Sequence, residues 1–428
     1  MSAKTSSTAQ SDAPEALDVD VLISGGGLAG GTLSLALAQA GFRVATVDLE
    51  NMATWTDQGF DGRASAIALS SQRVLAGVGI WDVIHQETAP MLDIRISDGH
   101  SPLFLHYDHT ELTDADGVSE PFGYMVENRS IRKALNVLVP NTEALTYFAP
   151  NRIQSLDRAA DAAHAVLQDG TRIRAKLVVS CEGRRSPLRD QAGIKLTKWD
   201  YHQAGIVCTV EHEKPHNFCA QEHFLPSGPF AILPLPGTAD KPACRSSIVW
   251  TEREDLWPLI MDLDDEAFLE ELVERFGDFL GGVTLVGPRF AYPFSLQYAH
   301  EYVKDRFALV ADSAHGMHPI AGQGLNMGLR DVAALVDVLT EARRMGQDIG
   351  SLAVLEHYQR WRRFDNTLML AVTDALVKLF SNAVEPVQLA RDLGMAAVGQ
   401  MPDVKRFFMR HAMGTVGELP TLMRRTSA

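Results

Sequence analysis

The sequence predicts an α/β protein of two domains: a Rossmann-like nucleotide-binding domain and an antiparallel-sheet substrate domain, followed by a C-terminal helical segment. Two glycine-containing turns follow short apolar runs, one near residue 25 and one near residue 320, and alternating apolar and polar runs fill much of the sequence between them. At 428 residues the chain exceeds the size at which one hydrophobic core usually stops growing. We therefore expect more than one domain.

The first element is a strand, a turn, a helix, a second strand and an acid. Val19–Ser24 reads as a strand, and Gly25-Gly26-Gly27-Leu28-Ala29-Gly30 after it satisfies G-x-G-x-x-G. Helix is expected over Gly31–Ala40 and strand over Arg43–Val47. Asp48 then lies 23 residues after Gly25, the distance at which a carboxylate meets an adenosine ribose. In this context the motif predicts dinucleotide binding, but it does not tell FAD from NAD.

The stretch Ala311–Asp331 is the most informative, because it favours a flavin. Arg306–Ala311 is expected to be a strand, and Asp312 after it is placed to accept hydrogen bonds from ribityl or ribose hydroxyls. Pro319 disfavours helix just before it, and helix is expected over Asn326–Leu339. A helix amino terminus aimed at a flavin would stabilise negative charge on the reduced ring. The alternative is a Gly/Pro turn into an ordinary helix with a chance aspartate.

A third motif lies between these two, and we call the three motifs stations of the predicted nucleotide site. Arg174–Ser180 is expected to be a strand, and a turn with a short basic segment follows over Cys181–Arg189. With three stations in this order, the chain resembles the group A aromatic-ring hydroxylases, the flavoprotein monooxygenases of the para-hydroxybenzoate hydroxylase type. Within them it is most similar to the ubiquinone-biosynthesis hydroxylases. The similar blocks run from about residue 18 to 425 and are Gly62–Ser70, Gly79–Trp81, Tyr124–Arg129, Gly228–Leu235 and His318–Asn326.

Two positions depart from the family pattern. The family's Asp-Gly is Glu182-Gly183 here, and its Gly-Asp is Ala311-Asp312. Glutamate keeps the charge but is one methylene longer. Alanine adds a methyl group at a point where the backbone approaches the cofactor in the family.

The resemblance implies FAD as cofactor and NADPH or NADH as co-substrate. It also implies oxygen transfer through a flavin C4a-hydroperoxide to the ring of a polyprenylated phenol in ubiquinone biosynthesis. Two alternatives stay open: a related flavoprotein acting on another isoprenoid or a soluble aromatic substrate, and a noncatalytic flavin-binding subunit of a lipid-synthesis complex. The expected cofactor-binding residues are Gly25, Gly27, Leu28, Ala29, Gly30, Asp48, Arg63, Arg129, Asp312, Pro319, Gly322, Gln323, Gly324, Leu325 and Asn326.

These residues have different expected roles. The turn at Gly25–Gly30 cradles the pyrophosphate, Asp48 holds the adenosine ribose, and residues 322–326 line the pyrimidine edge of the isoalloxazine. Arg63 and Arg129 match arginines that contact FAD in the family, with surface ion pairs as the alternative. Arg189 is expected to shape the NAD(P)H approach or the fold.

The sequence does not identify a catalytic side chain. His315 and His318 are candidates to relay the phenol proton, because histidine has an unperturbed pKa of about 6.5. The alternative is that either one only hydrogen-bonds the loop. Candidates for the substrate pocket are Phe224, Ile232, Leu233 and Trp250, for which ordinary core packing is the alternative.

The predicted division of the chain is discontinuous, because three distant stations must meet one ligand. Residues 1–17 are expected to be a disordered tail, and 18–85, 121–198 and 288–345 the FAD-binding domain. Residues 86–120 and 199–287 would form the substrate domain, and 346–428 the helical region. Strands are expected over Met91–Ser97, Gly205–Val210, Pro229–Leu235 and Arg245–Thr251, and amphipathic helices over Asp262–Arg275 and Leu352–Leu379.

Composition excludes several functions. A net charge of −15 argues against nucleic acid as a partner. The four cysteines show no metal spacing, so no metal is expected, and we predict reduced thiols in a cytoplasmic protein. No run of 18 uninterrupted apolar residues predicts a membrane span.

The last 28 residues are basic on an otherwise acidic chain. They hold Lys405, Arg406, Arg410, Arg424 and Arg425 against Asp403 and Glu418, a net charge of 5 − 2 = +3, with Phe407, Phe408 and Met409 interleaved. Such a segment could rest on an anionic membrane surface at the inner face, or on a partner protein of a ubiquinone-biosynthesis complex. A capping helix is the alternative.

Overall fold

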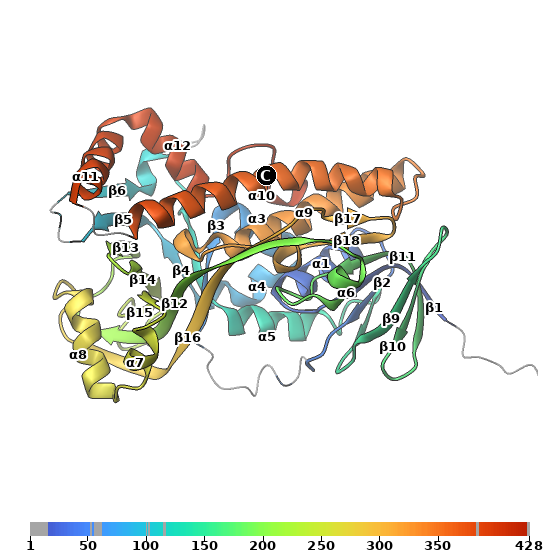
Figure 1. Cartoon of the computed structure of the whole chain (residues 1–428), viewed down its shortest axis with the longest axis horizontal. Coiled ribbons are helices and arrows are strands. Elements are labelled where there is room, and N and C mark those ends of the chain that lie inside the picture. Colours follow the sequence, from blue (N-terminus) through green and yellow to red (C-terminus); the bar gives the residue numbers. More distant parts are fainter. Residues whose placement is uncertain are drawn as a thin grey trace, which may run out of the picture.

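A computed structural model describes residues 16–51, 54, 62–99, 101, 103–113, 117–381 and 385–425. Two eight-stranded sheets lie at opposite ends of an elongated molecule, and the long helix α10 (Leu352–Phe380) runs over both of them (Figure 1). The fold class expected from the sequence is confirmed. Most of the predicted disordered tail lies outside the described residues, and strand β1 already begins at Leu17.

The nucleotide sheet has a parallel centre. Its strand order is β17-β18-β11-β1-β2-β8, with the antiparallel pair β9 and β10 attached to β11. The strands are β1 (Leu17–Ser24), β2 (Val44–Val47), β8 (Leu145–Phe148), β9 (Ile153–Arg158), β10 (Ala163–Leu167), β11 (Arg172–Ser180), β17 (Val303–Lys304) and β18 (Phe307–Leu309). Strand β1 pairs in parallel with β11, from Leu17↔Ile173 to Ser24↔Ser180. The central strands are continuous apolar runs because helices cover them.

Helices pack against this sheet and against one another. They are α1 (Leu28–Gln39), α3 (Leu69–Gly77), α4 (Ile80–Ile84), α5 (Asn128–Leu138), α6 (Pro187–Gln191) and α9 (Gln323–Arg344). Helix α1 contacts α5 and α9, and α9 contacts α10. One core cluster spans these helices and the sheet, so the three separate stretches of sequence form one unit.

The substrate sheet is almost entirely antiparallel, with the order β19-β16-β12-β15-β14-β13-β5-β6. Its strands are β5 (Asp93–Asp98), β6 (Phe104–Asp108), β12 (Leu196–His212), β13 (Cys219–Leu225), β14 (Gly228–Leu235), β15 (Arg245–Arg253), β16 (Val283–Ala299) and β19 (His315–Gly316). Helices α7 (Trp257–Met261) and α8 (Asp265–Phe276) lie over one face of it. As predicted, α8 is amphipathic, and it buries Phe268, Leu272 and Phe276.

A small third sheet joins the two large ones. It consists of β3 (Ala64–Ala68), β7 (Gly123–Glu127) and β4 (Thr88–Met91), in the order β3-β7-β4. The predicted strand Met91–Ser97 is therefore wrong as a single element. Met91 ends β4 in this sheet, and β5 begins at Asp93 in the substrate sheet.

Helices α11 (Glu385–Gln400) and α12 (Pro402–Ala412) follow α10. Arg391 of α11 is buried, and its guanidinium binds Asp98 at the end of β5, with Nε to Oδ2 at 2.6 Å. This buried ion pair fastens the C-terminal helices to the substrate sheet. The residue limits of the predicted domains stay a prediction.

Candidate cofactor site and its substrate side

The glycine-rich turn after β1 needs each of its motif glycines for a different reason. Gly25 has a φ of +98°, and a Cβ on it would lie 2.5 Å from the carbonyl oxygen of Cys181. A Cβ on Gly30 would lie 1.9 Å from the carbonyl oxygen of Gly25, so Gly30 lets α1 pack against the turn. A Cβ on Gly27 would meet no atom within 4 Å. Gly27 therefore faces open space at the start of α1, where a pyrophosphate could approach the backbone.

Asp48 lies beside this turn at the carboxyl end of β2. Its Oδ2 accepts a hydrogen bond from the backbone N–H of Gly26, and its Oδ1 accepts one from Glu50 at 2.7 Å. Burial raises the pKa of Asp48, against the effect of these two N–H donors. The carboxylate and the turn are thus brought together as predicted, in the arrangement that binds an adenosine ribose.

Glu182 organises the third station. Its carboxylate accepts hydrogen bonds from the hydroxyl groups of Ser24 at 2.7 Å and Ser186 at 2.5 Å, and from the backbone N–H of Leu188 at 3.1 Å. The glutamate therefore joins the end of β1 to the start of α6. The extra methylene relative to the family's aspartate is accommodated inside the loop.

Ala311 and Asp312 follow β18 in a short turn rather than in the predicted strand. Ala311 has a φ of +57°, which ends the strand at Leu309. Its methyl group points at α9, because a Cβ on Gly328 would lie 2.8 Å from it. The Asp312 side chain is half-exposed, and one of its oxygens lies 3.7 Å from Nε of Arg184. Asp312 is thus free to face a ligand, and the alanine methyl packs away from it.

We expect Ala311→Gly to raise the free energy of unfolding by roughly 0.5 to 1 kcal/mol, because glycine relieves a left-handed conformation that costs alanine about 1 kcal/mol or more. Thermal unfolding followed by circular dichroism would measure it. Ala333→Gly, in the buried middle of α9, is the matched control and should lose about 1 kcal/mol. Equal losses in both variants would contradict the argument.

His315 is held in a buried network rather than aimed at an open site. Its Nε2 lies 2.6 Å from Oδ2 of Asp331, and Oδ1 of Asp331 accepts from Nε of Arg362 at 2.8 Å and from Nδ2 of Asn366 at 3.2 Å. The same carboxylate accepts the backbone N–H of Ala311 at 3.1 Å. This geometry supports the alternative that His315 holds the loop.

Burial opposes the charge of Asp331. The neighbouring His315 and Arg362 outweigh this effect, and they hold the pKa of Asp331 at about 2. The network therefore keeps Asp331 ionised and paired with Arg362 beneath the turn that carries Asp312.

The start of α9 has the open backbone expected at a flavin edge. Gly322 caps the helix with a φ of +62°, and a Cβ on Gly324 would meet no atom within 4 Å. Asn326 has a different role, since its side chain accepts from the N–H of Ala68 at 2.9 Å and donates to the carbonyl of Ala66 at 2.8 Å. It ties α9 to β3. The remaining predicted residues of this loop, Pro319, Gln323 and Leu325, lie in the same turn and first helical residues.

His318 is fully buried at the edge of this loop. Its Nδ1 accepts the backbone N–H of Ile320 at 3.2 Å, so the proton of the neutral ring lies on Nε2. Nε2 has no hydrogen-bond partner among the described residues. The ring lies between Tyr201 and Phe294, with centroids at 5.0 and 4.6 Å, and burial lowers its pKa to about 3. His318 is therefore a neutral donor rather than a base.

We expect His318 to make the protein acid-sensitive. Folding lowers its pKa, so its contribution to stability is full above pH 6.5 and is lost as pH falls towards about 3, since the unfolded chain takes up the proton first. Between about pH 6.5 and about pH 4.5 this loss should amount to about 2 to 3 kcal/mol. Urea unfolding of wild type and His318→Gln across that range would measure it. A stability difference between them that did not shrink on acidification would contradict the assignment.

Arg63 and Arg129 lie at the same end of the small sheet: Arg63 precedes β3, Arg129 follows β7, and Ala64 pairs with Glu127 between them. The Arg129 guanidinium binds Glu127 at 2.7 Å, and that of Arg63 lies 5.7 Å from the ring centre of Tyr292. Arg129 thus has the ion pair that was the alternative expectation, and its contact with FAD stays a prediction. Arg189 is buried and donates to the carbonyls of Arg184 and Ser313, so it supports the fold.

The predicted pocket residues divide between the two faces of the substrate sheet. Phe224 and Leu233 belong to the cluster on the side of α10 and Ile320, and Phe224 stacks on Phe380 at 4.1 Å. Ile232 and Trp250 lie in the core beneath α8, because strand alternation turns them to the opposite face. Core packing was the alternative expectation for both residues.

Sequence reasoning missed three functional positions. Arg184 donates to the carbonyl of Ser295 at 2.7 Å and of Met317 at 3.1 Å, which joins the nucleotide loop to the substrate sheet. Tyr201 packs on His318, and Arg362 neutralises Asp331. Of these three, only Arg362 could have been found from the sequence. It is a charged residue at helical spacing within the apolar face of α10, which indicates a buried ion pair. Among the described residues no group of His, Cys, Asp or Glu could hold a metal ion, and the four cysteines there are free.

Comparison with known proteins identifies the cofactor. The family model described as FAD binding domain matches residues 18–366. The fold is that of p-nitrophenol 4-monooxygenase PnpA from Pseudomonas putida DLL-E4, with a TM-score of 0.75 and 20% identity over 93% of this chain and 98% of that one. The family match and the turns together define an FAD-binding protein, and the prediction of FAD is confirmed.

Two relatives similar over most of this chain define its family more closely. Ubiquinone hydroxylase UbiL of Rhodospirillum rubrum is 54% identical over 408 residues, which are 95% of this chain and 92% of that protein. The 3-demethoxyubiquinol 3-hydroxylase of Escherichia coli is 34% identical over 397 residues, 92% of this chain and 98% of that protein. The chain belongs to the family of FAD-dependent ubiquinone-biosynthesis hydroxylases, as the sequence motifs predicted.

Proposed function

We propose that this enzyme hydroxylates the aromatic ring of a polyprenylated phenol in ubiquinone biosynthesis. One atom of O2 enters a ring C–H bond to give a C–OH group, the other leaves as water, and NAD(P)H supplies the two electrons. The observation that carries the proposal is 54% identity to a ubiquinone hydroxylase over 95% of the chain. The Gly25–Gly30 turn and the open backbone at Gly324 support it.

FAD, when bound, carries electrons from NAD(P)H to oxygen and supplies the oxygen chemistry. The protein's part is to bind, orient and exclude water. Gly27 and Asp48 would hold the adenosine diphosphate end, Asp312 the ribityl region, and Gly322 and Gly324 the isoalloxazine edge. Leu233 and Ile320, in one apolar cluster, would keep water from the reacting ring.

His318 would meet the phenol oxygen. Its Nε2–H is buried without a partner among the described residues, and it can donate a hydrogen bond to a phenol or phenolate. Because burial keeps its pKa at about 3, His318 stays neutral at working pH and orients the phenol without removing its proton.

The test uses the purified protein and a deletion strain. The protein should be yellow and should oxidise NAD(P)H faster when a prenylated phenol is added. A strain without the gene should accumulate a prenylated phenol, and mass spectrometry of that intermediate would identify the ring carbon. Unchanged ubiquinone in the strain would refute the pathway, and protein that cannot be reconstituted with FAD would refute the chemistry.

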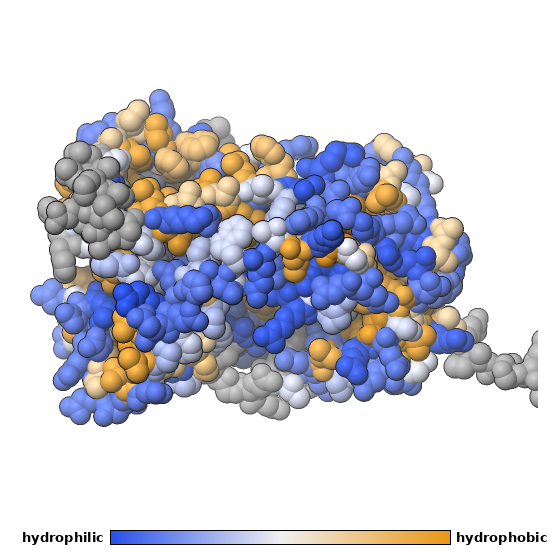
Figure 2. All heavy atoms as spheres, viewed as in Figure 1, coloured by the Kyte–Doolittle hydropathy of each residue, from blue (hydrophilic) through white to orange (hydrophobic). Residues whose placement is uncertain are grey.

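We also propose a peripheral contact with an anionic membrane through α12 and the outer face of α10. On α12, Phe407 and Phe408 are 51% and 43% exposed, beside the exposed Arg406 and Arg410. An apolar stripe at helical spacing runs along α10 and consists of Phe364, Leu368, Val372, Leu376 and Leu379. Hydrophobic side chains gather over these helices in Figure 2. No helix in the described ranges is long and apolar enough to cross a bilayer.

Sedimentation with vesicles tests this contact. Wild type should sediment with vesicles that contain phosphatidylglycerol and much less with phosphatidylcholine alone, because exposed arginines favour anionic lipid. Phe407→Ser with Phe408→Ser should abolish the sedimentation, whereas Phe104→Ser, at an equally exposed phenylalanine on β6, should not. Failure of wild type to bind either vesicle would leave α12 as a capping helix or a protein contact.

A further inference from the structure

Two adjoining hollows lie between β12 and the C-terminal end of α10. The inner one, of about 500 Å³, is lined by Trp199, Asp200, Tyr201 and Gln203 of β12 and by Val377, Lys378 and Ser381 at the end of α10. Its lining is mixed: Trp199, Tyr201 and Val377 supply apolar surface, and the ammonium of Lys378 lies 6.0 Å from the ring centre of Trp199. We call the two hollows together the α10–β12 groove.

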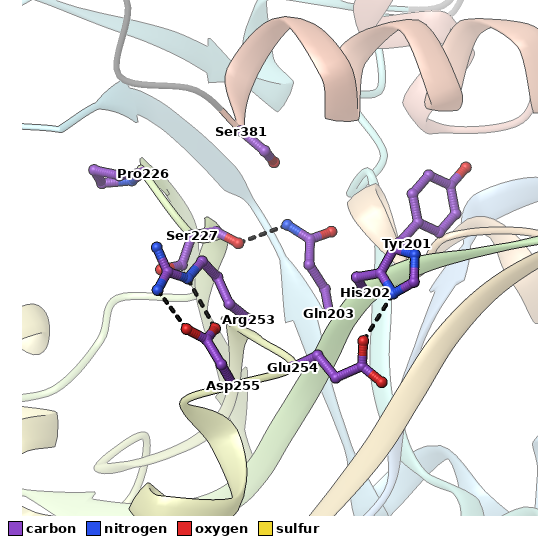
Figure 3. A pocket seen from close by; sticks show the side chains of 9 residues that line it. All are labelled: Tyr201, His202, Gln203, Pro226, Ser227, Arg253, Glu254, Asp255 and Ser381. Carbon is purple, nitrogen blue, oxygen red and sulfur yellow. Dashed lines mark hydrogen bonds and ion pairs between the residues drawn. The ribbon is translucent and has the colours of Figure 1, made fainter.

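The outer hollow, of about 520 Å³, shares Tyr201, Gln203 and Ser381 with the inner one. Figure 3 shows Ser381 at the helix end facing these strand residues across the opening. Paired charges form its outer wall, with Arg253 bound to Asp255 and His202 to Glu254, each at 2.7 Å. The outer hollow is therefore the more highly charged of the two, and the apolar surface of the groove lies at Trp199 and Val377 of the inner hollow.

The apolar stripe of α10 ends at this groove. Leu376 and Leu379 are 36% and 44% exposed, and they lie in the same helical turn as Val377 and Lys378, which line the inner hollow. A hydrophobic surface on the outside of the protein is thus continuous with the groove. An amphiphile resting on α10 would meet the groove without crossing water.

Tyr201 separates the groove from the buried loop. One side of the residue lines both hollows, and the ring meets His318 edge to face at 5.0 Å. Its hydroxyl donates to Oδ1 of Asp374 at 3.1 Å, and Oδ2 of Asp374 binds Lys378 at 2.7 Å. Tyr201 also packs against the apolar cluster that contains Leu233. Behind this one side chain lie an apolar lining and a buried donor, Nε2–H of His318, with no partner among the described residues.

From this geometry we propose that the α10–β12 groove is the entrance for the substrate, that it holds the isoprenoid tail, and that Tyr201 is the gate towards His318. The proposal rests on the proposed hydroxylation of a polyprenylated phenol. The tail lies between Trp199 and Val377 while the phenol head passes Tyr201 and reaches the donor on His318. The tethering of Tyr201 to Asp374 closes the site when no substrate is bound.

Filling the groove tests the proposal. Gln203→Trp and Ser381→Trp place a ring in the hollows, and Leu259→Trp, at an exposed position on α7 that lines neither hollow, is the control. With a long-tailed phenol, the two groove variants should raise KM about tenfold or more, and with a one-isoprene phenol they should stay within about twofold of wild type. Leu259→Trp should match wild type with both. Equal effects on both tail lengths, or none, would overturn the proposal.

The proposed gate at Tyr201 is tested separately, by measuring how much of the oxidised NAD(P)H yields hydrogen peroxide. Tyr201→Phe frees the ring from Asp374, so a larger share of the NAD(P)H oxidised should yield hydrogen peroxide rather than hydroxylated product. Lys304→Ala, a control at a half-buried lysine on β17 that lines neither hollow, should leave this ratio unchanged. An unchanged ratio in Tyr201→Phe would remove the gate from the proposal.

Photolabelling separates failure of the groove from failure of the function. A long-tailed phenol carrying a diazirine at the tail end should label peptides that contain residues 199–203 or 377–381, and unlabelled long-tailed phenol should compete. Labelling elsewhere overturns the groove even if turnover is normal. Absence of hydroxylation with correct labelling would refute the proposed reaction and leave the groove as the lipid-binding site.

Discussion

Replacing Asp331 with asparagine is expected to lower the free energy of unfolding by about 3 to 5 kcal/mol, the largest stability loss we predict for one substitution. The carboxylate is completely buried, and it binds Arg362, Asn366, His315 and the N–H of Ala311. An amide cannot neutralise the guanidinium of Arg362, which would remain charged in the core. Urea unfolding monitored by tryptophan fluorescence would measure the loss.

The position of Asp331 gives the variant a second effect. The same carboxylate anchors the turn that carries Asp312, so retention of FAD should fall together with stability. Asp337→Asn is a control on the same helix, since Asp337 accepts an exposed backbone N–H from Thr421, and it should lose less than about 1 kcal/mol. Wild-type stability in Asp331→Asn would show that the network contributes nothing net.

Gly27→Ala is expected to weaken FAD binding by about tenfold or more while the apoprotein remains as stable as wild type. The backbone at Gly27 has φ −62° and ψ −164°, which alanine adopts without strain. The added methyl would meet no protein atom within 4 Å and would project into the space left for the pyrophosphate. Quenching of flavin fluorescence on titration into apoprotein would give the Kd.

Two further alanine variants bracket this result. Gly394→Ala adds a methyl to open space on α11 and should leave FAD binding unchanged. Gly30→Ala forces a Cβ to within 1.9 Å of the Gly25 carbonyl, so it should lower both stability and FAD content. If Gly27→Ala bound FAD with wild-type affinity, the pyrophosphate would have to lie elsewhere.

Local patterns predicted the nucleotide half of the fold well. Strand β1, the turn to Gly30, α1, β2 and Asp48 follow one another within a few tens of residues, so short-range sequence carries both the elements and their contacts. The parallel β11 and β18 have similarly clear apolar runs. The carboxyl ends of these strands meet at one sheet edge, which brings the three predicted stations together.

The substrate side could not be predicted to the same degree. Nearly every residue of β14 and β15 is buried, because both faces of this sheet are covered, one by α8 and the other by α10 and its neighbours. Nothing local distinguishes the face of Trp250 from that of Phe224. Contacts with other elements make that choice, such as Trp250 with Phe268 of α8 and Tyr201 with Asp374 of α10.

Similar limits apply to the histidines. His315 and His318 are three residues apart in the sequence and have equivalent local signals, yet one binds Asp331 and the other lies between two aromatic rings. Their partners come from α9, β12 and β16. A histidine's chemistry is decided by those neighbours, which the loop sequence does not contain.

Helix α10 makes the two halves of the molecule a single mechanical unit. Near its start Tyr358 donates to the carbonyl of Leu309 at 2.9 Å in the nucleotide sheet, and at its end Phe380 stacks on Phe224 in the substrate sheet. A helix of 29 residues spans about 43 Å. Force applied to its exposed apolar side would therefore reach the loop of Asp312 through Arg362 and Asp331, and the α10–β12 groove through Asp374, at once. We therefore expect the nucleotide half and the substrate half to unfold together, in one cooperative thermal transition.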